Sequence, residues 1–259
     1  MKLDIVMTSY YSCAYLNQNY ATTKYWNPNL DIKWIVVQNT PEPELLIPHV
    51  FVIPGVERPV MDENWCGSYH HGLALNKGKE YIRDDTDCVL FLDPDFFILP
   101  KLDHIMKYMG ENCLDIFGAS YHFNKKNLDR EFPCGFCMFF NSKTVNIEEL
   151  DFEPGFGEFS DNGAWPDVGH KITRRLKDKT QYEVVIPVEG FKDSYLVNAH
   201  LNTTHNRLYK WQNKPFGIHC AMKIQFFKEK ENFARLRRKT SYLMENIMKI
   251  REIDYPAYC

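Results

Sequence analysis

The sequence predicts an α/β fold built on a mostly parallel sheet flanked by helices, and three observations support this prediction. The chain has 259 residues and is 44% hydrophobic, which is enough for the core of one large α/β domain or two small ones. Strand-like and helix-like patterns alternate along its N-terminal part, as is typical of a doubly wound sheet. The apolar run 88–92 has the length and composition of a strand buried on both faces, and it leads directly into Asp93-Pro94-Asp95.

The loop after this apolar run is the first candidate functional site. Pro94 cannot donate a hydrogen bond to a sheet, so it marks the end of the strand and leaves Asp93 and Asp95 just beyond it. Ligands of open α/β sheets bind outside the carboxyl ends of the strands. Two carboxylates there are suited to a hard divalent cation, which would in turn bind phosphates. The alternative is a pair of turn aspartates that only cap the backbone, and the spacing alone leaves both interpretations open.

Hydrophobic periodicity predicts the elements before this loop. A first strand at 3–10 ends in small polar residues, and a helix at 12–26 stops at Asn27-Pro28-Asn29. Further strands are expected at 32–37 and 49–53, followed by a helix from about Ser68 to Arg83. Within that helix, Gly72 costs about 1 kcal/mol relative to alanine, so it indicates close approach of a neighbour, a strand or a ligand.

The elements after the loop are less regular. Strands are expected at 114–119, 133–141, 182–188 and 195–199, with a long acidic and aromatic loop at 151–167. Asp167 is placed to cap a helix that carries Val168, Ile172 and Leu176 on one face. The pattern from about 222 to 251 is helical and basic. We therefore place the α/β domain at residues 1–215 and a helical C-terminal extension at 216–259.

Composition limits the partners. The net charge of -3 gives no reason to expect nucleic acid, and no segment is long and apolar enough to span a membrane. Without a signal-peptide pattern, we expect a cytoplasmic protein with free cysteines, in which Cys134 and Cys137 are core thiols and not a metal or redox pair. The basic C-terminal segment is either a solvated helix face, which we favour, or a peripheral contact with anionic lipid or an acidic acceptor.

The order of motifs around the central strand resembles that of glycosyltransferases of the GT-A fold, close to the family 2 type. The matching pattern is a helix with Ser-x-x-His-Gly-x-Ala-Leu-Asn at 68–76, a polar turn, an apolar strand and Asp-x-Asp at 93–95. The resemblance covers roughly residues 3 to 180 in the order of elements. It implies a nucleotide diphosphate sugar as donor, a hydroxyl acceptor such as a glycan, and Mg²⁺ or Mn²⁺ as cofactor.

The resemblance also assigns roles to particular residues. Those implied to bind the donor nucleotide are Thr8, Ser9, Tyr10, Gln38, Asn39, Ser68, His71, Gly72 and Asp93. The implied metal ligands are Asp93, Asp95 and a histidine, for which His200 stands first, then His205, then His219. A neutral imidazole ligates Mn²⁺ more readily than Mg²⁺, which prefers oxygen. Asp167 is implied as the general base, with Asp161 as the second candidate.

Two other classes of protein remain open at this point. A nucleotidyltransferase also places paired acids after a parallel strand, but it would carry a Gly-rich phosphate loop where this chain has Thr8-Ser9-Tyr10-Tyr11-Ser12. A non-catalytic nucleotide-sugar or glycan-binding protein could use the same fold. Among transferases, direct displacement assisted by one base inverts the anomeric configuration, and a retaining mechanism stays an alternative because a fold does not fix stereochemistry.

Overall fold

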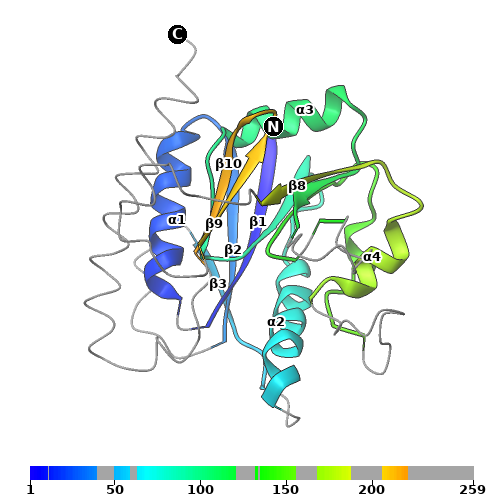
Figure 1. Cartoon of the computed structure of the whole chain (residues 1–259). Helices are drawn as coiled ribbons and strands as arrows, with labels where there is room; N and C mark the ends of the chain where they lie inside the picture. Colours follow the sequence, from blue (N-terminus) through cyan, green and yellow to red (C-terminus); the bar gives the residue numbers. More distant parts are fainter. Residues whose placement is uncertain are drawn as a thin grey trace.

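The structure, a computed structural model, describes residues 1–10, 12–39, 50–58, 63–120, 132–133, 135–155, 168–187 and 206–220. In these ranges the chain forms a mixed sheet flanked by helices, which confirms the predicted α/β fold class (Figure 1). The strands are β1 (Lys2–Ser9), β2 (Asp31–Gln38), β3 (Val50–Pro54), β4 (Cys88–Leu92), β5 (Phe96–Ile98), β6 (Ile116–Ala119), β7 (Cys137–Asn141), β8 (Tyr182–Pro187), β9 (Asn206–Trp211) and β10 (Lys214–Cys220). The helices are α1 (Cys13–Trp26), α2 (Glu63–Lys79), α3 (Leu102–Glu111) and α4 (His170–Leu176), with a short 3₁₀ helix, η2 (Ile147–Glu149).

The strand order places a topological switch point in the parallel half of the sheet. The order is β3-β2-β1-β4-β7-β6-β8-β9-β10-β5. The chain builds outward from β1 through β2 to β3, and then returns to add β4 on the other side of β1, all in parallel. Beyond β4 the pairing is antiparallel except between β6 and β8. Open sheets of this kind bind ligands where the strand order reverses, which here is at the carboxyl ends of β1 and β4.

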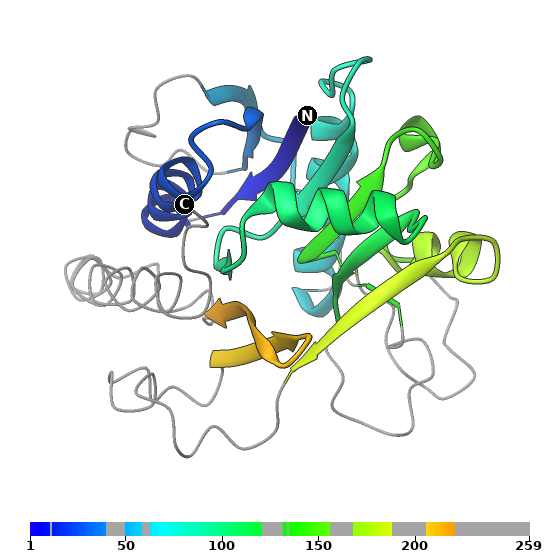
Figure 2. The same ribbon diagram turned by 90° about the horizontal axis from the view of Figure 1, so that it is seen from above.

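Alternating side chains of the central strands pack into two cores on opposite faces of the sheet. Ile5 of β1 belongs to the core formed with α1 and α3, whereas its neighbour Val6 belongs to the core formed with α2 and α4. Helices α1 and α2 accordingly lie on opposite sides of the parallel strands (Figures 1 and 2). Strand β4 is buried along its whole length, as predicted for a strand covered on both faces.

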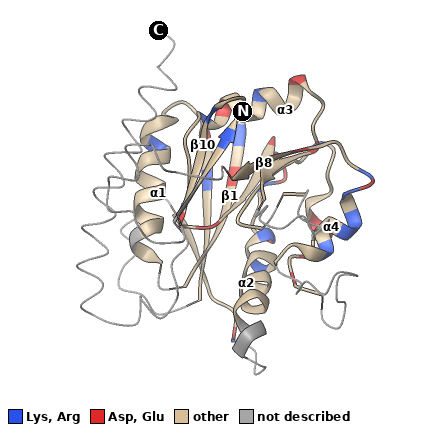
Figure 3. Cartoon of the chain, in the orientation of Figure 1, with Lys and Arg blue, Asp and Glu red and all other residues tan. Residues whose placement is uncertain are grey.

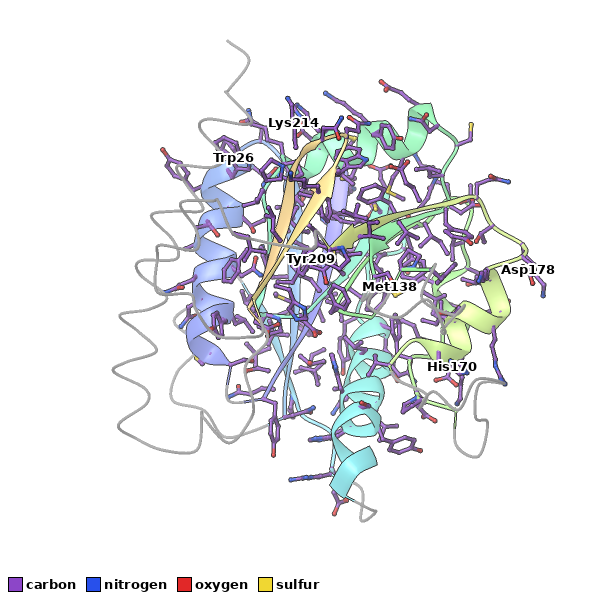
Figure 4. The ribbon with its side chains drawn as sticks, viewed as in Figure 1. Trp26, Met138, His170, Asp178, Tyr209 and Lys214 are labelled. Atoms are coloured by element: carbon purple, nitrogen blue, oxygen red, sulfur yellow. The ribbon has the colours of Figure 1, made fainter. Side chains whose placement is uncertain are left out.

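Strands β9 and β10 form a β-hairpin, and its second strand pairs with the short strand that follows the Asp-x-Asp loop. Strands β9 and β10 are joined at Gln212 and Asn213, which both have positive φ, as a two-residue type I′ turn requires. Strand β10 then pairs with β5, which follows β4 after only the Asp-x-Asp loop. Tyr209 of β9 is fully buried and lies near the middle of the molecule in Figure 4. The hairpin therefore lies against the loop that leaves the central strand.

Several boundaries differ from the predicted ones. Helix α2 begins at Glu63 and ends at Lys79, whereas the predicted range was 68–83. It ends early because the backbone N–H groups of residues 80–82 bond to carbonyls three residues back, and not four as in an α-helix. The predicted strand 133–141 begins only at Cys137, since Gly135 and Phe136 form a turn. Helix α3 and the β9–β10 hairpin were not predicted, and β10 spans the proposed domain boundary between residues 215 and 216.

Parts of the predicted organisation fall outside the described residues. These are the strand at 195–199, the basic segment at 222–251 and Cys134. Cys137 is fully buried, in agreement with its predicted place in the core, and burial raises the pKa of its thiol. No helix within the described ranges has both the length and the apolar character needed to cross a membrane.

Candidate active site

Two aspartates and one histidine converge just beyond the carboxyl end of the central strand. One ligand atom from each of Asp93, Asp95 and His219 can be chosen so that all three lie within 4.8 Å of one another. The side chain of His219 is only 4% exposed, and those of Asp93 and Asp95 are 20% and 23% exposed. The predicted pair of carboxylates therefore shares one site with the histidine that the sequence placed third. His200 and His205 lie outside the described residues.

The register of the last strand pair delivers His219 to this site. His219 of β10 is paired with Phe96 of β5, the residue that follows Asp95. Its Nε2 lies 3.5 Å from Asp95 Oδ1. The imidazole stacks on the ring of Phe136 with a centroid distance of 4.8 Å and an interplanar angle of 9°. Strand register fixes the position of the imidazole along the sheet, and stacking fixes the plane of its ring.

A second histidine contacts the other aspartate. His71 of α2 places its Nε2 at 3.2 Å from Asp93 Oδ1. This carboxylate oxygen is buried, and no donor in the described part of the chain is aligned to hydrogen-bond it. A buried carboxylate oxygen without a hydrogen bond is costly unless another partner supplies positive charge. Two carboxylates and an imidazole are a donor set suited to Mn²⁺, so the residues present fit a divalent metal ion.

The predicted nucleoside-binding residues at the ends of β1 and β2 divide into buried and accessible ones. Thr8 and Ser9 are buried, whereas Tyr10, Gln38 and Asn39 are half-buried at the sheet edge. The backbone N–H of Asn39 donates to the Ser9 carbonyl at 2.9 Å, so the ends of both strands stay together beyond the sheet.

Residues after β3 and in α2 extend this edge. Asn39 Oδ1 accepts a hydrogen bond from the Val56 N–H at 3.1 Å, and the Val56 carbonyl lies 2.9 Å from His70 Nε2. The His70 ring meets Tyr10 edge-on at 5.9 Å, and Arg58 donates to the Tyr10 hydroxyl. The sequence did not identify Arg58 or His70 as candidate site residues. It identified His71, which is next to His70 in the chain.

Gly72 allows the close approach of a neighbouring segment, which is one of the reasons that the sequence indicates for a glycine there. A Cβ at this position would lie 2.5 Å from the Phe152 carbonyl oxygen, so glycine is required by the close approach of that backbone. Asn76, one turn further along α2, accepts a hydrogen bond from the Phe152 N–H at 3.0 Å and donates to Asp151 Oδ1 at 2.9 Å. Both motif residues therefore hold the segment around Phe152 against the helix.

Helix α4 holds the other side of the same segment. Lys171 binds Asp151 at 2.7 Å and Glu153 at 3.3 Å, and the Gly169 N–H donates to the Phe152 carbonyl at 3.3 Å. Burial raises the pKa of the Asp151 carboxyl, but the hydrogen bonds from Lys171 and Asn76 outweigh it and lower that pKa overall. Helix α4 carries several basic residues, which are blue in Figure 3. These contacts tie together the two ends of the predicted loop 151–167.

The prediction that Asp167 caps α4 was wrong. The helix begins at His170, and its N-cap is Gly169, whose φ of 85° turns the chain into the helix without a side-chain cap. A positive φ of this size is readily adopted only by glycine, so Gly169 is the sequence signal for the start of this helix. Asp161 and Asp167 themselves lie outside the described residues.

No family model matches the chain, and no curated protein sequence matches it. Among solved structures, a fragment of TarS from S. aureus (residues 1–349) matches with a TM-score of 0.45 and 12% identity, over 71% of this chain and 58% of that one. The galactosyltransferase LgtC with donor and acceptor sugar analogs matches with a TM-score of 0.40 and 16% identity, over 58% of this chain and 62% of that one. The mannosyltransferase PcManGT from Pyrobaculum calidifontis, in complex with GDP-Man and Mn²⁺, matches with a TM-score of 0.43 and 10% identity, over 96% of this chain and 72% of that one.

Glycosyltransferases are thus among the solved structures that this chain resembles. The chain spans less than two thirds of the TarS fragment and of LgtC. All three likenesses are distant. The fold and site define an α/β protein with a candidate metal site at its topological switch point.

Proposed function

We propose that this protein is a metal-dependent glycosyltransferase that moves a sugar from a nucleotide diphosphate sugar to a hydroxyl group of an acceptor such as a glycan. The observation that carries the proposal is the cluster of Asp93, Asp95 and His219 at the carboxyl end of β4. This is the place where doubly wound sheets bind nucleotides, and the donor set is one that would hold a divalent ion against a diphosphate.

Different side chains of the site would bind different parts of the donor. Asp93, Asp95 and His219 would hold Mn²⁺ or Mg²⁺, and the imidazole favours Mn²⁺. When bound, the ion offsets the negative charge that develops on the departing diphosphate. Tyr10, Gln38 and Asn39 are accessible at the neighbouring strand ends and would contact the nucleoside.

Asp167 remains our candidate for the general base, with Asp161 second. Its carboxylate would take the proton from the acceptor hydroxyl as that oxygen attacks the anomeric carbon, so the configuration would invert. Its nearest described neighbours, Val168 and Gly169, follow directly in the chain, and Gly169 is bonded to Phe152 beneath the site helix α2. This anchoring holds the chain that directly follows the candidate base next to α2 and α4.

Thermal unfolding with a panel of ligands tests the proposed function. The protein would be melted with nucleoside diphosphates and their sugars, each with and without Mn²⁺. A ligand at 100 times its dissociation constant adds about 2.7 kcal/mol to the free energy of unfolding, which is an easily measured shift. We expect one nucleotide series to raise the melting temperature only when Mn²⁺ is present. No shift with any of them at saturating concentration would favour a non-catalytic protein.

The role of Asp167 gives a separate prediction. Asp167→Asn should lower the transfer rate by about 10²-fold or more, because general base catalysis contributes about that much, while donor binding stays unchanged. Product formation would be measured alongside Mn²⁺-dependent donor binding. Asp178→Asn, which removes an exposed carboxylate just after α4, is the matched control (labelled in Figure 4). Transfer by Asp167→Asn at the control's rate would exclude this base.

A further inference from the structure

We propose that Asn19 of α1 is a positioning residue that holds the Asp93-Pro94-Asp95 loop in the geometry needed to bind metal. No sequence pattern indicates this role, because Asn19 stands in the middle of a helix far from the loop in the chain. The inference depends on the proposed function, since it takes Asp93 and Asp95 to be metal ligands. Its test is therefore chosen to separate the two.

The side-chain amide nitrogen of Asn19 donates two hydrogen bonds to the loop. Asn19 Nδ2 donates to the Phe96 carbonyl at 2.8 Å and to the Pro94 carbonyl at 3.2 Å. These two carbonyls stand on either side of Asp95. A single side chain therefore fixes the backbone immediately before and immediately after one candidate ligand.

Asn19 is itself held in one orientation. Its side chain is buried, with 1% of the residue exposed, and its Oδ1 accepts a hydrogen bond from Thr23 Oγ1 at 3.2 Å. Because the hydroxyl donor faces the amide oxygen, the amide nitrogen is left to face the loop. Buried backbone carbonyls need donors, so the loop would have to rearrange if this amide were removed.

Backbone hydrogen bonds and the pairing of β5 with β10 also hold this loop, but neither contacts α1. The Asp93 N–H donates to the Phe136 carbonyl at 2.9 Å, and the Phe96 N–H donates to the Asp93 carbonyl at 3.1 Å. These bonds secure Asp93 and close the turn. The connection from the turn to α1 is made by Asn19, on the face of the sheet opposite α2 and its His71.

A second buried asparagine on the same helix provides a matched control. Asn27, the C-cap of α1, is 6% exposed and also makes two buried hydrogen bonds. It donates to the Thr23 carbonyl at 2.9 Å and accepts from the Leu102 N–H at 2.8 Å. Asn27 thus secures the start of α3 and not the Asp93-Pro94-Asp95 loop. Asn27→Ala removes a comparable buried network at a different place.

The experiment compares Mn²⁺ binding by Asn19→Ala, Asn27→Ala and the unaltered chain, without nucleotide, using electron paramagnetic resonance of the free ion. Groups that orient metal ligands typically change metal affinity about 10- to 100-fold when they are removed, so we expect Asn19→Ala to bind Mn²⁺ at least about tenfold more weakly. Asn27→Ala should lose thermal stability without that change in affinity. Wild-type affinity in Asn19→Ala, or an equal loss in Asn27→Ala, would overturn the positioning role.

Thr23→Val covers the case in which Asn19→Ala fails to fold. Valine keeps the shape of threonine but removes the hydroxyl that orients the Asn19 amide. Mn²⁺ affinity should then fall by a smaller factor in the same direction, and an unchanged affinity would contradict the proposal. Failure of the unaltered chain to bind Mn²⁺ is a different result, because it would refute the metal site of the proposed function itself.

Discussion

Asp95→Asn is expected to remove both Mn²⁺ binding and sugar transfer while the protein stays folded. Asparagine has the size of aspartate but lacks the negative charge that a divalent ion requires from its ligands. The side chain of Asp95 is 23% exposed, and the neighbouring His219 Nε2 is 3.5 Å from its Oδ1. Little stability therefore depends on the charge, whereas loss of transition-state charge stabilisation costs about 10²- to 10³-fold in rate.

This prediction is checked by three measurements on the same preparation: Mn²⁺ affinity, the rate of transfer, and the melting temperature without ligand. Asp84→Asn is the control, because Asp84 is an exposed aspartate in the turn before β4. An exposed substitution of this kind changes stability by no more than about 0.5 kcal/mol. If Asp95→Asn transfers sugar as fast as Asp84→Asn, then Asp95 is not a metal ligand.

The parallel half of the fold and the carboxylate pair could be predicted from the sequence. Strands β1, β2 and β4 contain apolar runs, helix α1 stops at Asn27-Pro28-Asn29, and Pro94 marks the end of the central strand without reference to any other part of the chain. The missed helix α3 also had a local signal, because its buried residues recur at helical spacing. These residues are Leu102, Ile105, Met106 and Met109.

The third member of the metal cluster, His219, could not be identified from local sequence patterns. Of the histidines that follow the loop in the chain, three were candidates, and local patterns rank them only by how polar their surroundings are. His219 reaches Asp95 because β10 pairs with β5 in one particular register, so that His219 stands opposite Phe96. Pairing between strands so far apart in sequence is a property of the folded sheet. The same holds for Asn19, whose helical neighbours give no sign that its amide faces a distant loop.

Arg83→Met should destabilise the protein more than any other substitution considered, by about 3–5 kcal/mol, because it leaves a buried carboxylate without its cation. Asp4 of β1 is completely buried, and Arg83 donates to it through the side-chain Nε and through the backbone N–H, each at 2.7 Å. The guanidinium also reaches Asp31 at the start of β2, at 3.0 Å. Methionine retains the packing of the alkyl chain but removes the charge that compensates Asp4.

Chemical denaturation of three variants separates this cause from a general loss of packing. Arg175→Met is the control, since Arg175 and its partner Glu149 form an ion pair at the surface, where such pairs contribute about 0–1 kcal/mol. Adding Asp4→Asn to Arg83→Met removes the uncompensated charge, so the double variant should be more stable than Arg83→Met alone. If it is not, the charge on Asp4 is not what makes Arg83 necessary. Because this ion pair lies at the amino ends of β1 and β2, opposite the metal loop, Mn²⁺ affinity should be unchanged in every variant that remains folded.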